Sequence, residues 1–106
     1  MKKFERKIIQ ELLEACPDIH YSLKDEYREE KIEYSGVGYF LTIKDELLPI
    51  NRFVLSTPYI GGTLDGISVG YLAFIENHEL MLECHVNVEE SVNPKHRNNG
   101  FIQEKT

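Results

Sequence analysis

Residues 66–88 decide the fold class, and their sequence is GISVGYLAFIENHELMLECHVNV. The first ten of them are rich in β-forming residues, residues 76–79 are polar, and residues 80–88 alternate strictly between two kinds of side chain. Because successive side chains of a strand point to opposite faces, this pattern predicts an antiparallel hairpin. One face carries Leu80, Leu82, Cys84, Val86 and Val88, and the other carries Met81, Glu83, His85 and Asn87. We expect the second face to be hydrated or available to a partner.

The N-terminal residues predict one amphipathic helix over residues 2–16. Phe4, Ile8, Leu12 and Cys16 are spaced four residues apart, and charged side chains occupy the opposite side. Pro17 cannot continue the helical hydrogen bonds, so the helix ends before it. We expect residues 18–33 to be an exposed acidic loop, with one short helical piece at most.

Further strands are expected between this loop and the hairpin. Residues 32–34 and 37–44 alternate, and the glycines between them indicate either one bent strand or two strands in a hairpin. Residues 52–56 predict another short strand, and Pro58 and Gly61-Gly62 predict a loop after it. Residues 89–106 are polar and without period, so we expect an irregular C-terminus.

Together these elements predict a single α+β domain over residues 1–106. An N-terminal amphipathic helix packs on an antiparallel sheet of four or five strands that ends in the C-terminal hairpin. The length of 106 residues leaves no room for a second domain.

The amino-acid composition limits the classes of partner that the chain can bind and the compartment in which it works. The chain has 12 Lys and Arg against 18 Asp and Glu, a formal net charge of −6. This balance opposes tight binding to nucleic acid, which requires clustered basic residues. Cys16 and Cys84 lie far apart and outside any C-x-x-C spacing, which indicates reduced thiols in a cytoplasmic protein. No stretch is long and apolar enough for a membrane helix.

The candidate catalytic groups do not form a recognisable constellation. Cys84 and His85 are neighbours in the predicted strand, so they point to opposite faces and cannot act as a nucleophile and its base. Glu83 and His85 share a face, with His78 near the turn, but this pattern does not complete a metal site. The glycine pairs lack the sequence of a phosphate-binding loop. We therefore expect no enzyme activity, no metal and no cofactor.

The acidic loop has the composition of a protein-binding surface. Tyr27 lies beside Glu29, Glu30 and Glu33, and tyrosines among carboxylates suit a cationic partner. A solvated acidic surface without a partner is the simpler alternative. The partner-binding candidates are Tyr27, Glu29, Glu30 and Glu33 on this segment, or Glu83 and His85 on the open face of the predicted hairpin.

Two stretches, GVGYFLTI (36–43) and VGYLAFIENHELMLEC (69–84), resemble strands of small acidic bacterial immunity proteins. Such proteins are encoded beside toxins of contact-dependent growth inhibition or polymorphic toxin systems. The resemblance implies a cytoplasmic, non-enzymatic antidote that binds a toxin domain, often a basic nuclease, and occludes its active site. It carries no catalytic residues onto particular positions. A third alternative is a structural homodimer joined through strand edges, because the predicted hairpin can leave an exposed edge, so both a monomer and a homodimer stay open.

A second hypothesis belongs to another class. A small-molecule-binding or hydrolytic α+β domain would enclose a pocket between helix and sheet, lined by Tyr39, Tyr71, Phe74 and Cys84. A closed core and the absence of any pocket of about 300 Å³ or more would remove the basis for this hypothesis.

Overall fold

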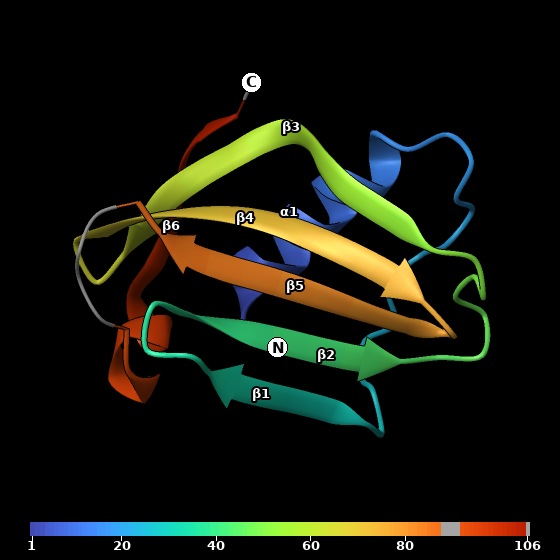
Figure 1. Ribbon diagram of the computed structural model, residues 1–106, viewed down its shortest axis with the longest axis horizontal. Helices are drawn as coiled ribbons and strands as arrows, with labels where there is room; N and C mark the ends of the chain where they lie inside the picture. Colours follow the sequence, from blue (N-terminus) through green and yellow to red (C-terminus); the bar gives the residue numbers. More distant parts are fainter. Residues whose placement is uncertain (88–91, 106) are drawn as a thin grey trace.

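The hairpin predicted at residues 66–88 forms the centre of the sheet in the computed structural model, which describes residues 1–87 and 92–105 (Figure 1). Strand β4 (Ile67–Glu76) pairs antiparallel with β5 (Glu79–Val86). Asn77 and His78 form the two-residue turn, and both have positive φ angles. A tight hairpin turn whose twist matches that of its strands requires this conformation.

The hairpin alternative is confirmed for the strands upstream. Strand β1 (Glu30–Tyr34) pairs antiparallel with β2 (Gly38–Lys44), and β2 pairs antiparallel with β5. Gly36 adopts a φ of +88° in the connection. At Gly38 a Cβ atom would lie 1.8 Å from the backbone oxygen of Cys84, so only glycine allows the two strands to approach this closely.

The loop predicted at Pro58 and Gly61-Gly62 is wrong. Strand β3 (Phe53–Leu64) is 12 residues long, contains Pro58 and both glycines, and pairs with β4. Its register against β4 shifts between Leu55 and Ile60. Pro58 therefore occupies an interruption of the ladder, where its missing N–H is tolerated.

The C-terminus is more regular than predicted. A 3₁₀ helix, η1 (Pro94–Asn99), is followed by strand β6 (Gly100–Lys105), which pairs antiparallel with β3. Over the described residues the sheet therefore has six strands, in the order β1-β2-β5-β4-β3-β6, rather than four or five. The predicted hairpin is β4–β5, and it is not the last element. Residues 88–91, where that hairpin was expected to end and the irregular tail to begin, lie outside the described residues, as does Thr106.

The predicted α+β architecture is confirmed. Helix α1 (Lys3–Glu14) lies behind the sheet in Figure 1 and buries its apolar side against one face. Residues 15–29 contain no regular element, as expected for the first part of the acidic loop. Glu30 and Lys31, which were expected in the same loop, belong to β1 instead. Fully buried residues between the helix and the sheet include Ile8, Ile9, Leu12, Tyr39, Leu41, Ile43, Val69, Ala73, Ile75, Leu80 and Leu82.

A buried ion pair joins the two ends of the chain on the helix side of the sheet. Glu5 is fully buried, and its carboxylate accepts hydrogen bonds from Arg97 Nε and Nη2, both at 2.8 Å. It also accepts bonds from the Tyr39 hydroxyl at 2.6 Å and from the Lys2 amide at 2.7 Å. Burial and the Glu5 carboxylate both raise the pKa of Tyr39, so this hydroxyl stays a donor.

Within the described ranges, no helix is long and apolar enough to cross a membrane.

Candidate functional site

The sheet face opposite α1, here called the open face, is covered by no element of the described chain. A row of cross-strand partners runs over it through five strands. In order across the sheet, the row consists of Lys31, Thr42, Met81, Phe74 and Val54. Val54 is 54% exposed and Met81 is 36% exposed, so apolar surface reaches the solvent here.

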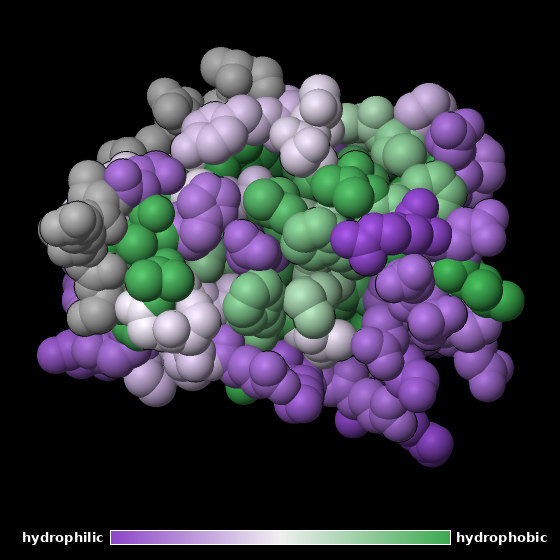
Figure 2. Space-filling view, viewed as in Figure 1, coloured by the Kyte–Doolittle hydropathy of each residue, from purple (hydrophilic) through white to green (hydrophobic). Residues whose placement is uncertain are grey.

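Charged residues border this apolar row on both sides. In the next row, Glu33, Phe40, Glu83 and Leu72 are successive partners. On the other side, Lys44, Glu79 and Glu76 follow one another, and Arg52 is bonded to Glu76. Figure 2 shows this face, with apolar side chains gathered in its middle and hydrophilic ones around them. An apolar centre with a polar rim is the usual anatomy of a protein-binding surface.

Two of the predicted site residues lie together on this face. Glu83 and His85 both face away from α1, and Glu83 Oε2 is 3.7 Å from His85 Nδ1. His85 Nδ1 is buried and has no hydrogen-bond partner in the described part of the chain. The ring lies over Gly70, where a Cβ atom would be 2.8 Å from His85 Nε2. Glycine at this position therefore makes room for the histidine.

The predicted separation of Cys84 from His85 is confirmed. Cys84 is 1% exposed and points into the core, so the two side chains lie on opposite faces. His78 does not join Glu83 and His85 either, because its Nδ1 is 2.8 Å from the backbone oxygen of Leu48 at the far end of β5. Among the described residues no group of three or more His, Cys, Asp or Glu side chains could hold a metal ion.

The buried thiol leads to a prediction about reactivity. Burial, as the main cause, raises the pKa of Cys84 to about 12, so almost no reactive thiolate is present at pH 8. Cys16 is only half-buried. At pH 8 we expect Ellman's reagent to modify Cys16 at least about 100-fold faster than Cys84. Mass spectrometry of the labelled peptides measures both rates, and the variant Cys16→Ser isolates Cys84. Rapid labelling of Cys84 in the folded Cys16→Ser protein would contradict the buried position.

The three glutamates predicted as one acidic patch have different ion-pair partners. The Glu33 carboxylate pairs with Lys31 at 2.6 Å on the open face. Glu30 forms an ion pair with the N-terminal amine of Met1, and Glu29 is exposed and lies 3.9 Å from the ammonium group of Lys44. All three nevertheless line one surface hollow of about 420 Å³, together with Met81 and other residues of the open face.

Tyr27 belongs to a hydrogen-bonded network that the sequence did not reveal. Its hydroxyl is 2.8 Å from the Tyr21 hydroxyl and accepts a bond from the Lys24 amide at 2.9 Å. Tyr21 in turn donates to Asp45 Oδ2 at 2.6 Å. This network fastens the acidic loop to the end of β2, and Tyr27 lines a surface hollow there together with Glu29, Asp45 and other residues. Tyr27 thus has a structural role in holding the loop.

Asp45 is the charged centre of this network. Burial acts to raise the pKa of its carboxyl group, but hydrogen bonds from Tyr21, the Leu47 amide and Lys24, and the Lys24 charge, together lower it. A carboxyl group whose pKa is lowered by folding adds stability above its unfolded pKa of about 3.9. That contribution is lost as the pH falls through the lower pKa of the folded state.

This gives a prediction for Asp45→Asn. We expect the free energy of unfolding at pH 7 to fall by about 1 to 2 kcal/mol, because charge-assisted hydrogen bonds are lost. The difference from the parent protein should shrink below about pH 4, where the parent's Asp45 also becomes protonated. Urea unfolding between pH 2 and pH 7 measures it. Glu46→Gln, an equal charge change at an exposed neighbour, is the control. A difference that stays constant down to pH 2 would contradict this mechanism.

The residues proposed to line a pocket between helix and sheet do not do so. Tyr39, Tyr71 and Cys84 are buried in the core on the side of α1. Phe74 lies on the open face, as its cross-strand partner Met81 does. These four side chains are therefore divided between the two faces of the sheet and line no common pocket, so this expected lining is wrong. Surface hollows of about 360 to 550 Å³ occur on the described part of the chain, but Tyr39, Tyr71 and Cys84 line none of them.

Comparison with known proteins identified no relative of this chain. No protein-family model, no curated protein and no solved structure matches this chain.

Proposed function

We propose that this chain is a non-enzymatic inhibitor of the immunity-protein class, which binds a basic toxin domain through the open face of its sheet. The observation that carries the proposal is the uncovered apolar row of Thr42, Met81, Phe74 and Val54 with its border of charged residues. A cytoplasmic location is part of the same proposal.

The apolar row supplies what affinity requires. The energy of protein association is concentrated in a few central apolar or aromatic side chains that lose water on binding. Phe74 and Met81 lie in the middle of the row, on the two central strands. A flat partner surface could cover them without any rearrangement of the sheet, and this rigidity lowers the entropic cost of binding.

The carboxylates supply the preference for a basic partner. Four carboxylates lie on this face with three cations, and the whole chain has a net charge of −6. The carboxylates are those of Glu33, Glu76, Glu79 and Glu83, and the cations are Lys31, Lys44 and Arg52. The active site of a nuclease is positively charged because it holds phosphates. An acidic protein is steered toward such a site, and the steering raises the association rate most strongly at low salt.

The experiment uses the product of the adjacent reading frame as the candidate toxin. Co-expression measures whether this chain relieves its growth inhibition, and surface plasmon resonance measures the association rate at several salt concentrations. Glu33→Lys/Glu83→Lys changes the open face, and Asp25→Lys/Glu26→Lys makes an equal charge change at two exposed residues of the acidic loop.

The proposal requires that the open-face pair slows association at least about tenfold more than the loop pair, with a weaker dependence on salt. The reverse order would overturn the placement on the open face and assign the site to the acidic loop. Absence of both binding and relief of inhibition would overturn the proposed function.

A further inference from the structure

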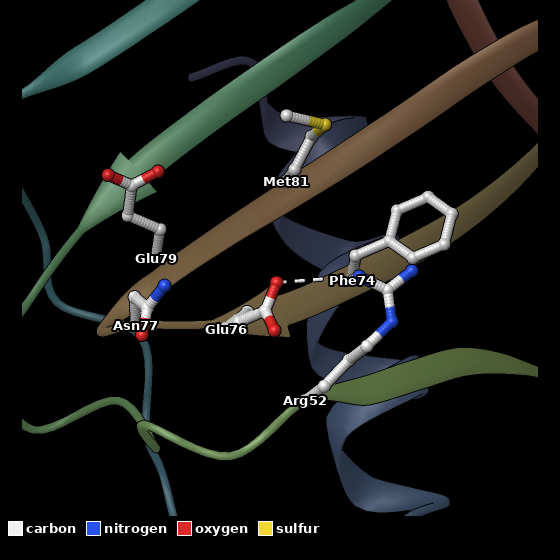
Figure 3. A pocket seen from close by; sticks show the side chains of 6 residues that line it. All are labelled: Arg52, Phe74, Glu76, Asn77, Glu79 and Met81. Atoms are coloured by element: carbon white, nitrogen blue, oxygen red, sulfur yellow. Dashed lines mark hydrogen bonds and ion pairs between the residues drawn. The ribbon is translucent and has the colours of Figure 1, made fainter.

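A shallow hollow of about 390 Å³ lies at the end of the open face, beside the β4–β5 turn (Figure 3). Phe74 and Met81, which are direct cross-strand partners, give it an apolar floor. Its polar lining comes from Glu76 and Glu79, which are partners at the end of the same two strands, and from Asn77 in the turn. An aromatic ring, a thioether and two carboxylates thus surround one space.

A guanidinium group of the chain itself already occupies one side of this hollow. Arg52 Cζ lies 5.5 Å from the centroid of the Phe74 ring, within the range of a cation–π contact. Its Nη1 is 3.4 Å from Glu76 Oε1, and Figure 3 shows the guanidinium between ring and carboxylate. The site therefore has the shape and chemistry that a planar cation requires.

The other side of the hollow has a carboxylate that is in no ion pair within 4 Å in the described part of the chain. This carboxylate is Glu79, which is exposed; its cross-strand partner is Lys44, and the charge of Lys31 also acts on it. Met81 borders the same space as Glu79. In Figure 3 both lie on the side away from Arg52. With two carboxylates and one guanidinium, the lining has a net charge of −1, which favours a further cation.

We propose that this hollow receives an arginine side chain of the basic partner, which displaces Arg52 from Phe74 and Glu76. The source of that arginine rests on the proposed function, but the site can be tested without the toxin. Glu76 and Glu79 bind the guanidinium by charge-assisted hydrogen bonds, and its plane packs on Phe74 and Met81. Arginine is favoured over lysine because its planar, weakly hydrated group matches both the ring and the carboxylates.

Displacing Arg52 from Phe74 and Glu76 costs little free energy. The side chains of Arg52 and Glu76 are 58% and 51% exposed, and exposed ion pairs contribute little. Loss of the internal contact should therefore cost the incoming arginine no more than about fivefold in affinity. Arg52 keeps the hollow closed to weaker cations and yields to a partner that makes additional contacts.

The test is a titration of the ¹⁵N-labelled protein with N-acetyl-L-arginine amide, followed by NMR at constant ionic strength. We expect saturable shifts at the amides of Phe74, Asn77, Glu79 and Met81, with a dissociation constant on the order of 10 mM. Arg52→Ala should bind two- to fivefold more tightly, as estimated from the loss of an exposed pair. Glu76→Gln/Glu79→Gln should bind at least about tenfold more weakly.

Two controls make the result decisive. Glu83→Gln removes a carboxylate from the same face outside the hollow and should leave the affinity unchanged. N-acetyl-L-lysine amide should bind more weakly than the arginine compound. Equal binding of the two compounds, or an Arg52→Ala affinity that is unchanged or lower, would overturn the arginine site. Because no toxin is present, neither result depends on whether the chain inhibits one.

Discussion

Replacement of Arg97 by methionine is expected to lower the free energy of unfolding by about 3 to 5 kcal/mol, the usual effect of removing one partner of a buried ion pair. Arg97 supplies two of the four hydrogen bonds to the Glu5 carboxylate, and Glu5 is fully buried. Methionine keeps much of the side-chain volume, so the loss comes from the uncompensated carboxylate rather than from a cavity.

The effect should extend beyond the local contact. Arg97 lies in η1, directly before β6, whereas Glu5 lies in the first turn of α1 and Tyr39 in β2. The ion pair therefore ties the C-terminal elements to the helix and to the sheet. We expect faster amide hydrogen exchange along β6 in the variant, in addition to the lower global stability.

Chemical denaturation measures the stability change. Lys95→Met, which removes an exposed cation from the same 3₁₀ helix, should change the free energy of unfolding by no more than about 0.5 kcal/mol. In Glu5→Leu/Arg97→Met both charges are gone, and we expect much of the lost stability to return. An Arg97→Met variant as stable as the Lys95→Met control would show that the pair does not hold these elements together.

The ion pair between Glu5 and Arg97 illustrates which parts of the fold can be predicted from the sequence and which cannot. The helix over residues 2–16 and the faces of β5 follow from periodicities within a few residues, and both predictions are confirmed. Glu5 and Arg97 are separated by 92 positions, and no local pattern links them. In the sequence Glu5 is one more charged residue in a charged first turn, so its complete burial could not be foreseen.

Strand β3 and strand β6 show the same limit. Pro58 and Gly61-Gly62 carry the local signal of a loop, yet all three lie in β3. The two glycines pair with β4, and Pro58 lies in the interruption of that pairing. On its other edge, β3 pairs with β6. Backbone pairing with a distant neighbour overrode the local preference in both strands. The sequence of β6 does not alternate between apolar and polar residues. Its strand conformation therefore depends on backbone pairing with the edge of β3.

The candidate site was predictable to a similar degree. Glu83 and His85 were placed on the correct face because side chains alternate along a strand. Tyr27 was chosen for its acidic neighbours, but its hydroxyl is bonded to Tyr21, on the same loop, and to the Lys24 amide. Phe74 was predicted to line a pocket between helix and sheet, and it lies on the open face instead. Along β4, Leu72 and Phe74 alternate with buried Tyr71, Ala73 and Ile75, so strand periodicity places Phe74 on the open face.

Met81→Lys is expected to have the largest effect on partner binding, a loss of at least about 100-fold in affinity. Met81 lies in the middle of the apolar row, between Thr42 on β2 and Phe74 on β4. A residue at the centre of an interface contributes about 2 to 4 kcal/mol when it is a binding hot spot. Lysine at this position adds the desolvation of a charge and repulsion from a basic partner.

The variant should fold as the parent does. Met81 is 36% exposed, and a lysine there can extend into solvent, so we expect a change in the free energy of unfolding of no more than about 1 kcal/mol. The matched control is Leu47→Lys, an equal charge change at a side chain that is 72% exposed and lies in the β2–β3 connection. It alters the net charge identically, so it should weaken binding no more than about threefold through reduced steering.

A third variant separates the two causes of the weaker partner binding expected for Met81→Lys, namely the lost apolar contact and the added charge. Met81→Ala removes the apolar side chain without adding charge, and its effect should be independent of salt, whereas the additional loss in Met81→Lys should shrink as salt increases. Isothermal titration calorimetry with the purified toxin domain at two salt concentrations measures both. If Leu47→Lys weakens binding more than Met81→Lys, the partner contacts the end of the sheet, and the open face is not its docking surface.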